Sequence, residues 1–108
     1  MKNYSIHIKE NSWLAKLGAI KLKHANCAMV IGNTIHLYQI PKSEFIQNLS
    51  LFRHEIEHIK QWKRIGFMLF PIQYVWYSFK YGYYNNPFEV EARLAESDID
   101  LLKWVKII

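Results

Sequence analysis

The chain contains one cysteine, Cys27, so it cannot form an internal disulfide bond, and a reduced, buried thiol is expected. It also lacks a stretch rich in glycine, serine or proline that could act as a linker, and it has no internal repeat. Residues 1–5 do not form the apolar core of a signal peptide. We therefore expect one domain, residues 1–108, in the cytoplasm.

Charge is scarce as well. Charged residues make up 21% of the chain and hydrophobic residues 51%, which indicates a folded globule and argues against disorder. The net charge is +5, but the lysines and arginines are spread along the chain and do not form one block. This pattern favours an ordinary basic surface, so we expect no nucleic-acid partner.

Periodicity and turn signals predict an α+β fold, with a small antiparallel sheet packed on about four helices. The strands are a segment near 4–9 and a hairpin near 26–40, which turns at Gly32-Asn33. Ser12 can cap a first helix with an apolar stripe, and Ser43 can cap a long helix that Gly66 ends. That stripe consists of Trp13, Leu14, Leu17, Ile20 and Leu22.

The long helix contains the motif His54-Glu55-Ile56-Glu57-His58. Two histidines four residues apart lie on one face of a helix and can bind one zinc ion, with Glu55 beside them to act on a zinc-bound water. Leu49, Phe52, Ile56 and Ile59 form a core stripe roughly 150° from the two histidines. The histidines therefore face either a second layer that contains a cleft or solvent. We interpret Glu57 as ordinary surface charge.

A catalytic zinc usually has three protein ligands and an open position, so a third ligand is needed. The segment 85–93 predicts a new helix with Asn86 as N-cap and Pro87 as its first residue. Glu89 is the favoured ligand because small Ala92, one turn later, would let two helices approach closely. Glu91 is the competitor on another face, and a capping box is the structural alternative for Glu89.

These residues resemble the gluzincin zinc metallopeptidases, in particular the minigluzincins and the catalytic cores of CAAX prenyl proteases, over about residues 25–96. The family's Glu-x-x-small-Asp pattern maps onto Glu89, Ala92 and Arg93. Arg93 departs from it, because the family often has an aspartate there that supports a zinc histidine. The resemblance implies hydrolysis of a peptide or protein substrate, with Glu55 as general base on the zinc-bound water. It also implies that strand 34–39 is a sheet edge that pairs with the substrate.

Other assignments stay open. Tyr83, Tyr84 and Arg93 are candidates to stabilise an oxyanion, and the sequence does not choose among them. Peptide deformylases also use HExxH with an upstream cysteine ligand, which would be Cys27 here, although its sequence setting differs. The alternative to a peptidase is a non-catalytic zinc-binding module that binds a partner or a membrane surface.

Two apolar segments complete the sequence. Residues 65–79 contain no charge and are too short for a secure transmembrane span. We expect them to form a buried helix over the histidine helix; alternatively, the aromatic segment 65–84 makes a peripheral membrane contact. The apolar tail is expected to end a core helix whose stripe is Ala92, Ala95, Ile99 and Leu102. Its alternative position is in the substrate cleft.

Overall fold

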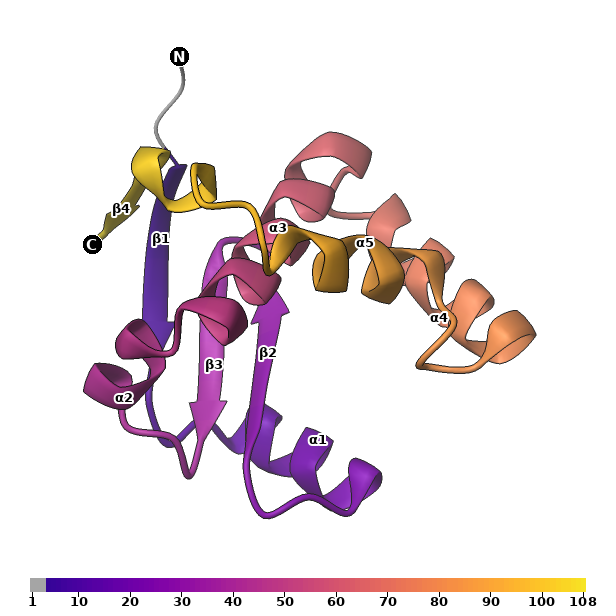
Figure 1. The fold of residues 1–108 in the computed structure, drawn as a ribbon. Helices are drawn as coiled ribbons and strands as arrows, with labels where there is room; N and C mark the ends of the chain where they lie inside the picture. The colour runs from indigo at the N-terminus through magenta and orange to yellow at the C-terminus, as the bar shows by residue number, and fades with distance from the viewer. Residues whose placement is uncertain (1–3) are drawn as a thin grey trace.

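A four-stranded mixed sheet in the order β2-β3-β1-β4 forms the centre of the computed structural model, which describes residues 4–108 (Figure 1). The α+β class is confirmed, but the sheet is not purely antiparallel as predicted. Only the β2–β3 hairpin is antiparallel, whereas β1 runs parallel to both β3 and β4. Alternating residues indicate strands without specifying their partners. The strands are β1 (Tyr4–Lys9), β2 (Cys27–Ile31), β3 (Thr34–Tyr38) and β4 (Val105–Ile107).

The predicted helix signals are found at several positions. Ser12 caps the first helix through Ala15 N, Gly66 follows the end of α3, and Asn86 caps α5 with Pro87 as its first residue. The predicted long helix is divided at Asn48, whose side chain accepts a hydrogen bond from Leu51 N and starts a new helix. The helices are α1 (Trp13–Leu22), α2 (Lys42–Gln47), α3 (Leu49–Ile65), α4 (Leu69–Tyr81) and α5 (Pro87–Ala95), with a short 3-10 turn, η1, at Leu101–Trp104.

The hydrophobic core lies between α3 and one face of the sheet. Ile35 and Leu37 of β3 point into it, opposite Ile56 and Ile59 of α3, and all four side chains are fully buried. Phe52 of the predicted stripe is also buried, whereas Leu49 is exposed. Because this face of α3 is buried against the sheet, the face that carries the two histidines points away from it.

Helix α1 contacts β2 and β3 from the other face of the sheet, where Ser12 Oγ lies 2.8 Å from His36 Nδ1. The predicted apolar stripe does not face the core: the buried residues of α1 are Ala15 and Ala19, whereas four of the five stripe residues are exposed, namely Trp13, Leu17, Ile20 and Leu22. The reason is close packing, since a Cβ atom added at Gly18 would lie 3.2 Å from Cys27 Sγ. Such a short separation leaves room only for small side chains.

The tail also differs from its prediction. Helix α5 ends at Ala95, and Asp98 then forms a turn by accepting a hydrogen bond from Asp100 N. The chain continues through η1 into β4, which pairs with β1 at the side of the sheet remote from β2 (Figure 1). The core-helix expectation is therefore wrong, and so is the placement in the substrate cleft, because the last residues complete the sheet.

Candidate metal centre

The two histidines of the HExxH motif and Glu89 lie together where α3 meets α5. Each offers one ligand atom, and the three atoms lie within 4.8 Å of one another. His54 Nε2 is 3.0 Å from Glu89 Oε1, and His58 Nε2 is 3.2 Å from Glu89 Oε2. His58 and Glu89 are buried, and only a small part of the His54 side chain is exposed. The alternative of solvated surface histidines is therefore wrong.

Helix α5 places Glu89 and Glu91 in different environments. The Glu89 carboxylate faces the two histidines, whereas Glu91 accepts hydrogen bonds from Gln61 and Arg64. The backbone N–H of Asn86 bonds to Tyr83 O and not to Glu89, so Glu89 does not form a capping box. Ala92 is fully buried, consistent with the close approach of the helices that its small side chain predicts. The geometry favours Glu89 over Glu91.

Both histidines are oriented by a second hydrogen bond. His54 Nδ1 lies 2.8 Å from Glu96 Oε2, and His58 Nδ1 lies 2.8 Å from Gln61 Oε1. Since these oxygens accept, each Nδ1 carries the hydrogen and each Nε2 is left to face Glu89. Gln61 is fully buried, and its amide nitrogen donates to Phe88 O, which fixes the orientation of the amide.

Glu96, and not the residue at position 93, accepts a hydrogen bond from a histidine of the cluster. Arg93 does not reach the histidines: its guanidinium lies 4.0 Å above the Tyr84 ring and donates a hydrogen bond to Tyr84 O. Arg53 of α3 donates to the backbone carbonyl of Glu96 and helps to hold it against α3. A signal for Glu96 was present in the sequence, because a residue seven positions after Glu89 returns to nearly the same helix face.

The donor set fits a zinc ion. Two imidazole nitrogens and a carboxylate are ligands that zinc commonly uses in catalytic sites with an open fourth position. Tetrahedral zinc with bonds of about 2.0–2.1 Å separates its ligand atoms by about 3.3 Å. His54 Nε2 lies 3.0 Å from Glu89 Oε1 and His58 Nε2 lies 3.2 Å from Glu89 Oε2, so each nitrogen is near that separation from one of the two carboxylate oxygens.

Burial and hydrogen bonding shift the pKa values at this site. Burial alone would raise the pKa of Glu89, but its hydrogen bonds with His54 and His58 outweigh burial and hold that pKa well below its usual range. Burial would lower the pKa of His54, but the hydrogen bond with Glu89 and nearby carboxylates raise it to about 9. In the absence of metal, the centre is therefore an ion-paired cluster.

Glu55, the predicted base, is only 4% exposed, and it lines the cavity together with His54 and His58. Its burial is the main cause that raises its pKa to about 7. The interpretation of Glu57 as surface charge is wrong, since Glu57 is 7% exposed. Its carboxylate lies 3.5 Å from Lys60 Nζ, and this ion pair compensates its burial.

A cavity of about 640 Å³ opens beside the three candidate ligands. Its walls come from α1, the whole of β2, α3 and α4, and Tyr83 and Glu89 complete its lining. The prediction that strand 34–39 forms an edge of the sheet is wrong, because β3 lies inside the sheet, between β2 and β1. Among residues 4–108, no strand pairs with the outer edge of β2, so the exposed sheet edge at this cavity belongs to β2.

Two tyrosines approach the site. The Tyr74 hydroxyl donates a 2.5 Å hydrogen bond to Glu89 Oε2, a contact that the sequence analysis missed because the face of α4 was unknown. Of the three oxyanion candidates, Tyr83 lines the cavity, whereas Tyr84 and Arg93 pair with each other outside it. Cys27 also lines the cavity, but the three residues that could hold a metal ion include Glu89 and not Cys27. The cluster thus disfavours the deformylase interpretation.

Helix α4 covers the site only in part. Phe70 is its one buried residue, and most of the helix is exposed, so the expectation of a buried helix is largely wrong. No helix within the described range, 4–108, is both long and apolar enough to cross a membrane.

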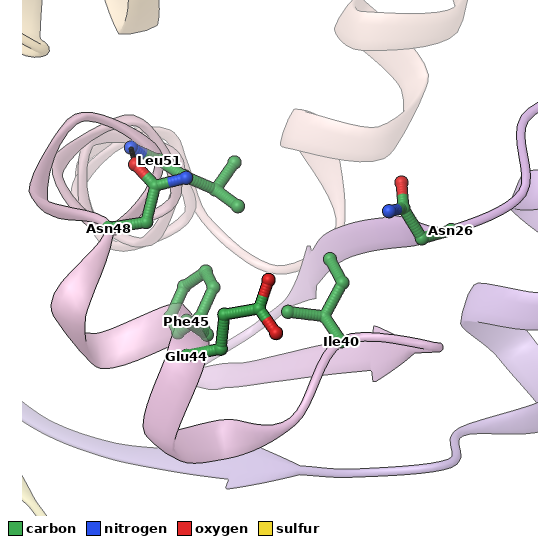
Figure 2. Close-up of a pocket in the computed structure, with 6 residues that line it drawn as sticks. All are labelled: Asn26, Ile40, Glu44, Phe45, Asn48 and Leu51. Carbon is green, nitrogen blue, oxygen red and sulfur yellow. Dashed lines mark hydrogen bonds between the residues drawn. The ribbon is translucent and has the colours of Figure 1, made fainter.

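A second, smaller cavity of about 230 Å³ lies beside α2. Figure 2 shows the six residues that line it: Asn26, Ile40, Glu44, Phe45, Asn48 and Leu51. None of them belongs to the histidine cluster, and Asn48 is engaged in capping α3. This cavity is therefore separate from the candidate metal centre.

Comparison with known proteins identifies no relative. No protein-family model, no curated protein and no solved structure matches this chain. Interpretation of the site consequently depends on the geometry of the chain's own residues.

Proposed function

We propose that this protein is a zinc-dependent metallopeptidase of the gluzincin type. In this proposal His54, His58 and Glu89 bind one zinc ion, and Glu55 is the general base. The observation that carries it is the convergence of three ligand atoms within 4.8 Å of one another at the wall of a large cavity, with Glu55 lining the same cavity. The hydrogen bonds that the two histidines donate to Glu96 and Gln61 support the proposal, because they orient both imidazole rings for metal binding.

A bound zinc ion would supply Lewis acidity, lowering the pKa of a water molecule and polarising a peptide carbonyl. Glu55 would accept the proton of the attacking water and pass it to the leaving amine. Its side chain lines the same cavity as His54 and His58, which places a proton acceptor beside the candidate ligands. Tyr83 is the remaining candidate to donate a hydrogen bond to the oxyanion, since of the three candidates it is the one that lines the cavity.

An extended peptide would bind along β2. The unpaired backbone groups of an edge strand can form a ladder with a peptide, and β2 lines the cavity along its whole length. This binding mode places a substrate backbone next to the metal centre without any further domain. In this proposal β2, and not β3 as the sequence suggested, is the strand that pairs with the substrate.

A matched pair of glutamate-to-glutamine variants, at positions 55 and 57, tests the role of the general base. Glu55→Gln should retain stoichiometric zinc and lose cleavage of an unfolded substrate such as casein, because it removes a proton acceptor without removing a ligand. Glu57→Gln is the matched control, a buried carboxylate two residues away that does not line the cavity, and it should stay active. Unchanged cleavage by Glu55→Gln would rule out Glu55 as the base.

Metal analysis separates the ligand assignment from activity. Glu89→Gln should lose zinc, while Glu91→Gln should keep it, because the Glu91 carboxylate contacts Gln61 and Arg64. The reverse result would refute the assignment of Glu89. If the wild type binds zinc through these ligands but cleaves no member of a panel of unfolded proteins, the non-catalytic zinc module replaces the peptidase.

A further inference from the structure

The large apolar side chains of α1 point away from the protein. Trp13, Leu17 and Ile20 lie within an arc of roughly 60°, opposite the buried Ala15 and Ala19, if each residue turns by about 100°. Trp13 is 64% exposed although it is the bulkiest residue of the helix. A helix that buries alanines and exposes tryptophan, leucine and isoleucine has an apolar face without a partner inside the fold.

Helix α4 repeats this arrangement. Its Phe70 is buried, whereas Ile72, Trp76 and Phe79 form an exposed stripe on another side of the helix. Phe79 is 86% exposed. Residues of α1 and α4 form walls of the same 640 Å³ cavity, so the two helices flank the candidate metal centre. We call these two exposed stripes together the α1/α4 surface: Trp13, Leu17 and Ile20 on α1, and Ile72, Trp76 and Phe79 on α4.

The charged side chains on α1 and α4 have one sign. Segments 11–43 and 58–88, which contain α1, the hairpin and α4, include no aspartate or glutamate, although the chain has nine acidic residues. On α1, Lys16 and Lys21 flank the apolar stripe, and Lys80 lies near the end of α4. Within residues 4–108, the salt bridges involve none of these three lysines. Their charges therefore remain available to an anionic partner.

We propose that the α1/α4 surface binds the surface of a membrane that contains anionic lipids. Exposed apolar stripes flanked by lysines, with tryptophans among the apolar residues, are the features by which helices lie in the membrane interface. A second copy of this chain does not fit as well, since it would bring lysines against lysines. Docking would hold the cavity between α1 and α4 close to the lipid surface. This inference does not depend on zinc or on peptidase activity.

Co-sedimentation with lipid vesicles tests the proposal on the full chain. The protein should bind vesicles of phosphatidylcholine and phosphatidylglycerol in equal parts and bind pure phosphatidylcholine much more weakly, with binding to the mixture falling as salt rises. Lys16→Gln combined with Lys80→Gln should weaken binding roughly 30-fold, at about fivefold for each charge lost near the surface. Brominated lipids should quench tryptophan fluorescence of the wild type in the same vesicles.

Two triple variants and a control separate lipid contact from general surface apolarity. Serine at Trp13, Leu17 and Ile20, or at Ile72, Trp76 and Phe79, should weaken vesicle binding by on the order of tenfold or more, because each variant removes the apolar contact of one helix. Leu94→Ser with Ile99→Ser is the control, since both residues are exposed and lie in neither helix. It should bind like the wild type.

Three results would overturn the proposal. They are an absence of binding to anionic vesicles at low salt, binding that neither triple variant weakens, and binding that the control weakens equally. Circular dichroism verifies that each variant is folded. A concentration-dependent dimer of the wild type that both triple variants abolish, without vesicle binding, would assign the surface to a second copy instead.

Discussion

Replacing Glu96 by alanine should weaken zinc binding although Glu96 is not one of the three candidate ligands. Its carboxylate accepts the Nδ1 hydrogen of His54 at 2.8 Å, which directs His54 Nε2 toward Glu89. Without this acceptor, the His54 ring can rotate and take the other tautomer, so part of the free energy of zinc binding is spent on restoring its orientation.

The expected loss follows from the geometry of the contact. Removing such an outer partner usually costs 10- to 100-fold in metal affinity, on the order of 1.4–2.7 kcal/mol. The Glu96 side chain is 35% exposed, so water can partly replace it, and we expect a loss near the lower limit, about tenfold. Glu96→Gln keeps an acceptor oxygen but loses the charge, and its loss should therefore be smaller.

Competition with a chromophoric chelator measures the zinc dissociation constant of each variant. Asp100→Ala is the control because it removes the same charge from an exposed side chain that pairs with Lys103 and is not part of the histidine cluster. A dissociation constant for Glu96→Ala equal to that of Asp100→Ala and the wild type would show that Glu96 does not orient His54.

Three further predictions concern the fold. Gln61→Leu should lower the free energy of unfolding by about 1–3 kcal/mol in urea titrations, because it leaves the buried Phe88 carbonyl without its donor; an unchanged midpoint would contradict this. Deletion of residues 103–108 should lower the melting temperature in circular dichroism, because it removes β4, and a stable, more active protein would refute that placement. Burial, with the charge of Lys9, lowers the pKa of His36, so the folded protein binds fewer protons there than the unfolded chain, and the contribution of His36 to stability should fall as pH drops below about 6.5. In metal-free protein, the stability of the wild type relative to His36→Gln should therefore fall below that pH, and a constant difference between the two pH profiles would exclude His36 as a cause.

Signals that act between near neighbours were readable from the sequence. Ser12, Gly66 and the Asn86-Pro87 pair act within one or two turns, and they mark helix ends where expected. The HExxH spacing places two histidines on one face whatever the rest of the fold does. The Glu89 prediction added one inference, that a helix beginning at Pro87 would approach α3 closely.

What the sequence could not reveal depends on contacts between distant segments. Gln61 and Tyr74 reach the site only because α5 and α4 lie against α3, and neither belongs to a motif. The orientation of α1 was mispredicted because periodicity identifies an apolar stripe but not what it faces. Here the separation between Gly18 and β2 decides that orientation. The edge of the sheet was misplaced for a similar reason, since strand order is set by which strands pair.

The pairing of β4 with β1 also has a consequence for how the chain folds. Tyr4 pairs with Val105 and Ile6 with Ile107, so this contact joins residues about a hundred positions apart. Closing so long a loop lowers the chain entropy before the contact adds any stabilisation, and this slows folding. During synthesis, the outer side of β1 stays unpaired until residues 105–107 have emerged, and an unpaired strand is a site for association with other chains. The chain would thus remain open to such association at β1 until β4 has paired with it.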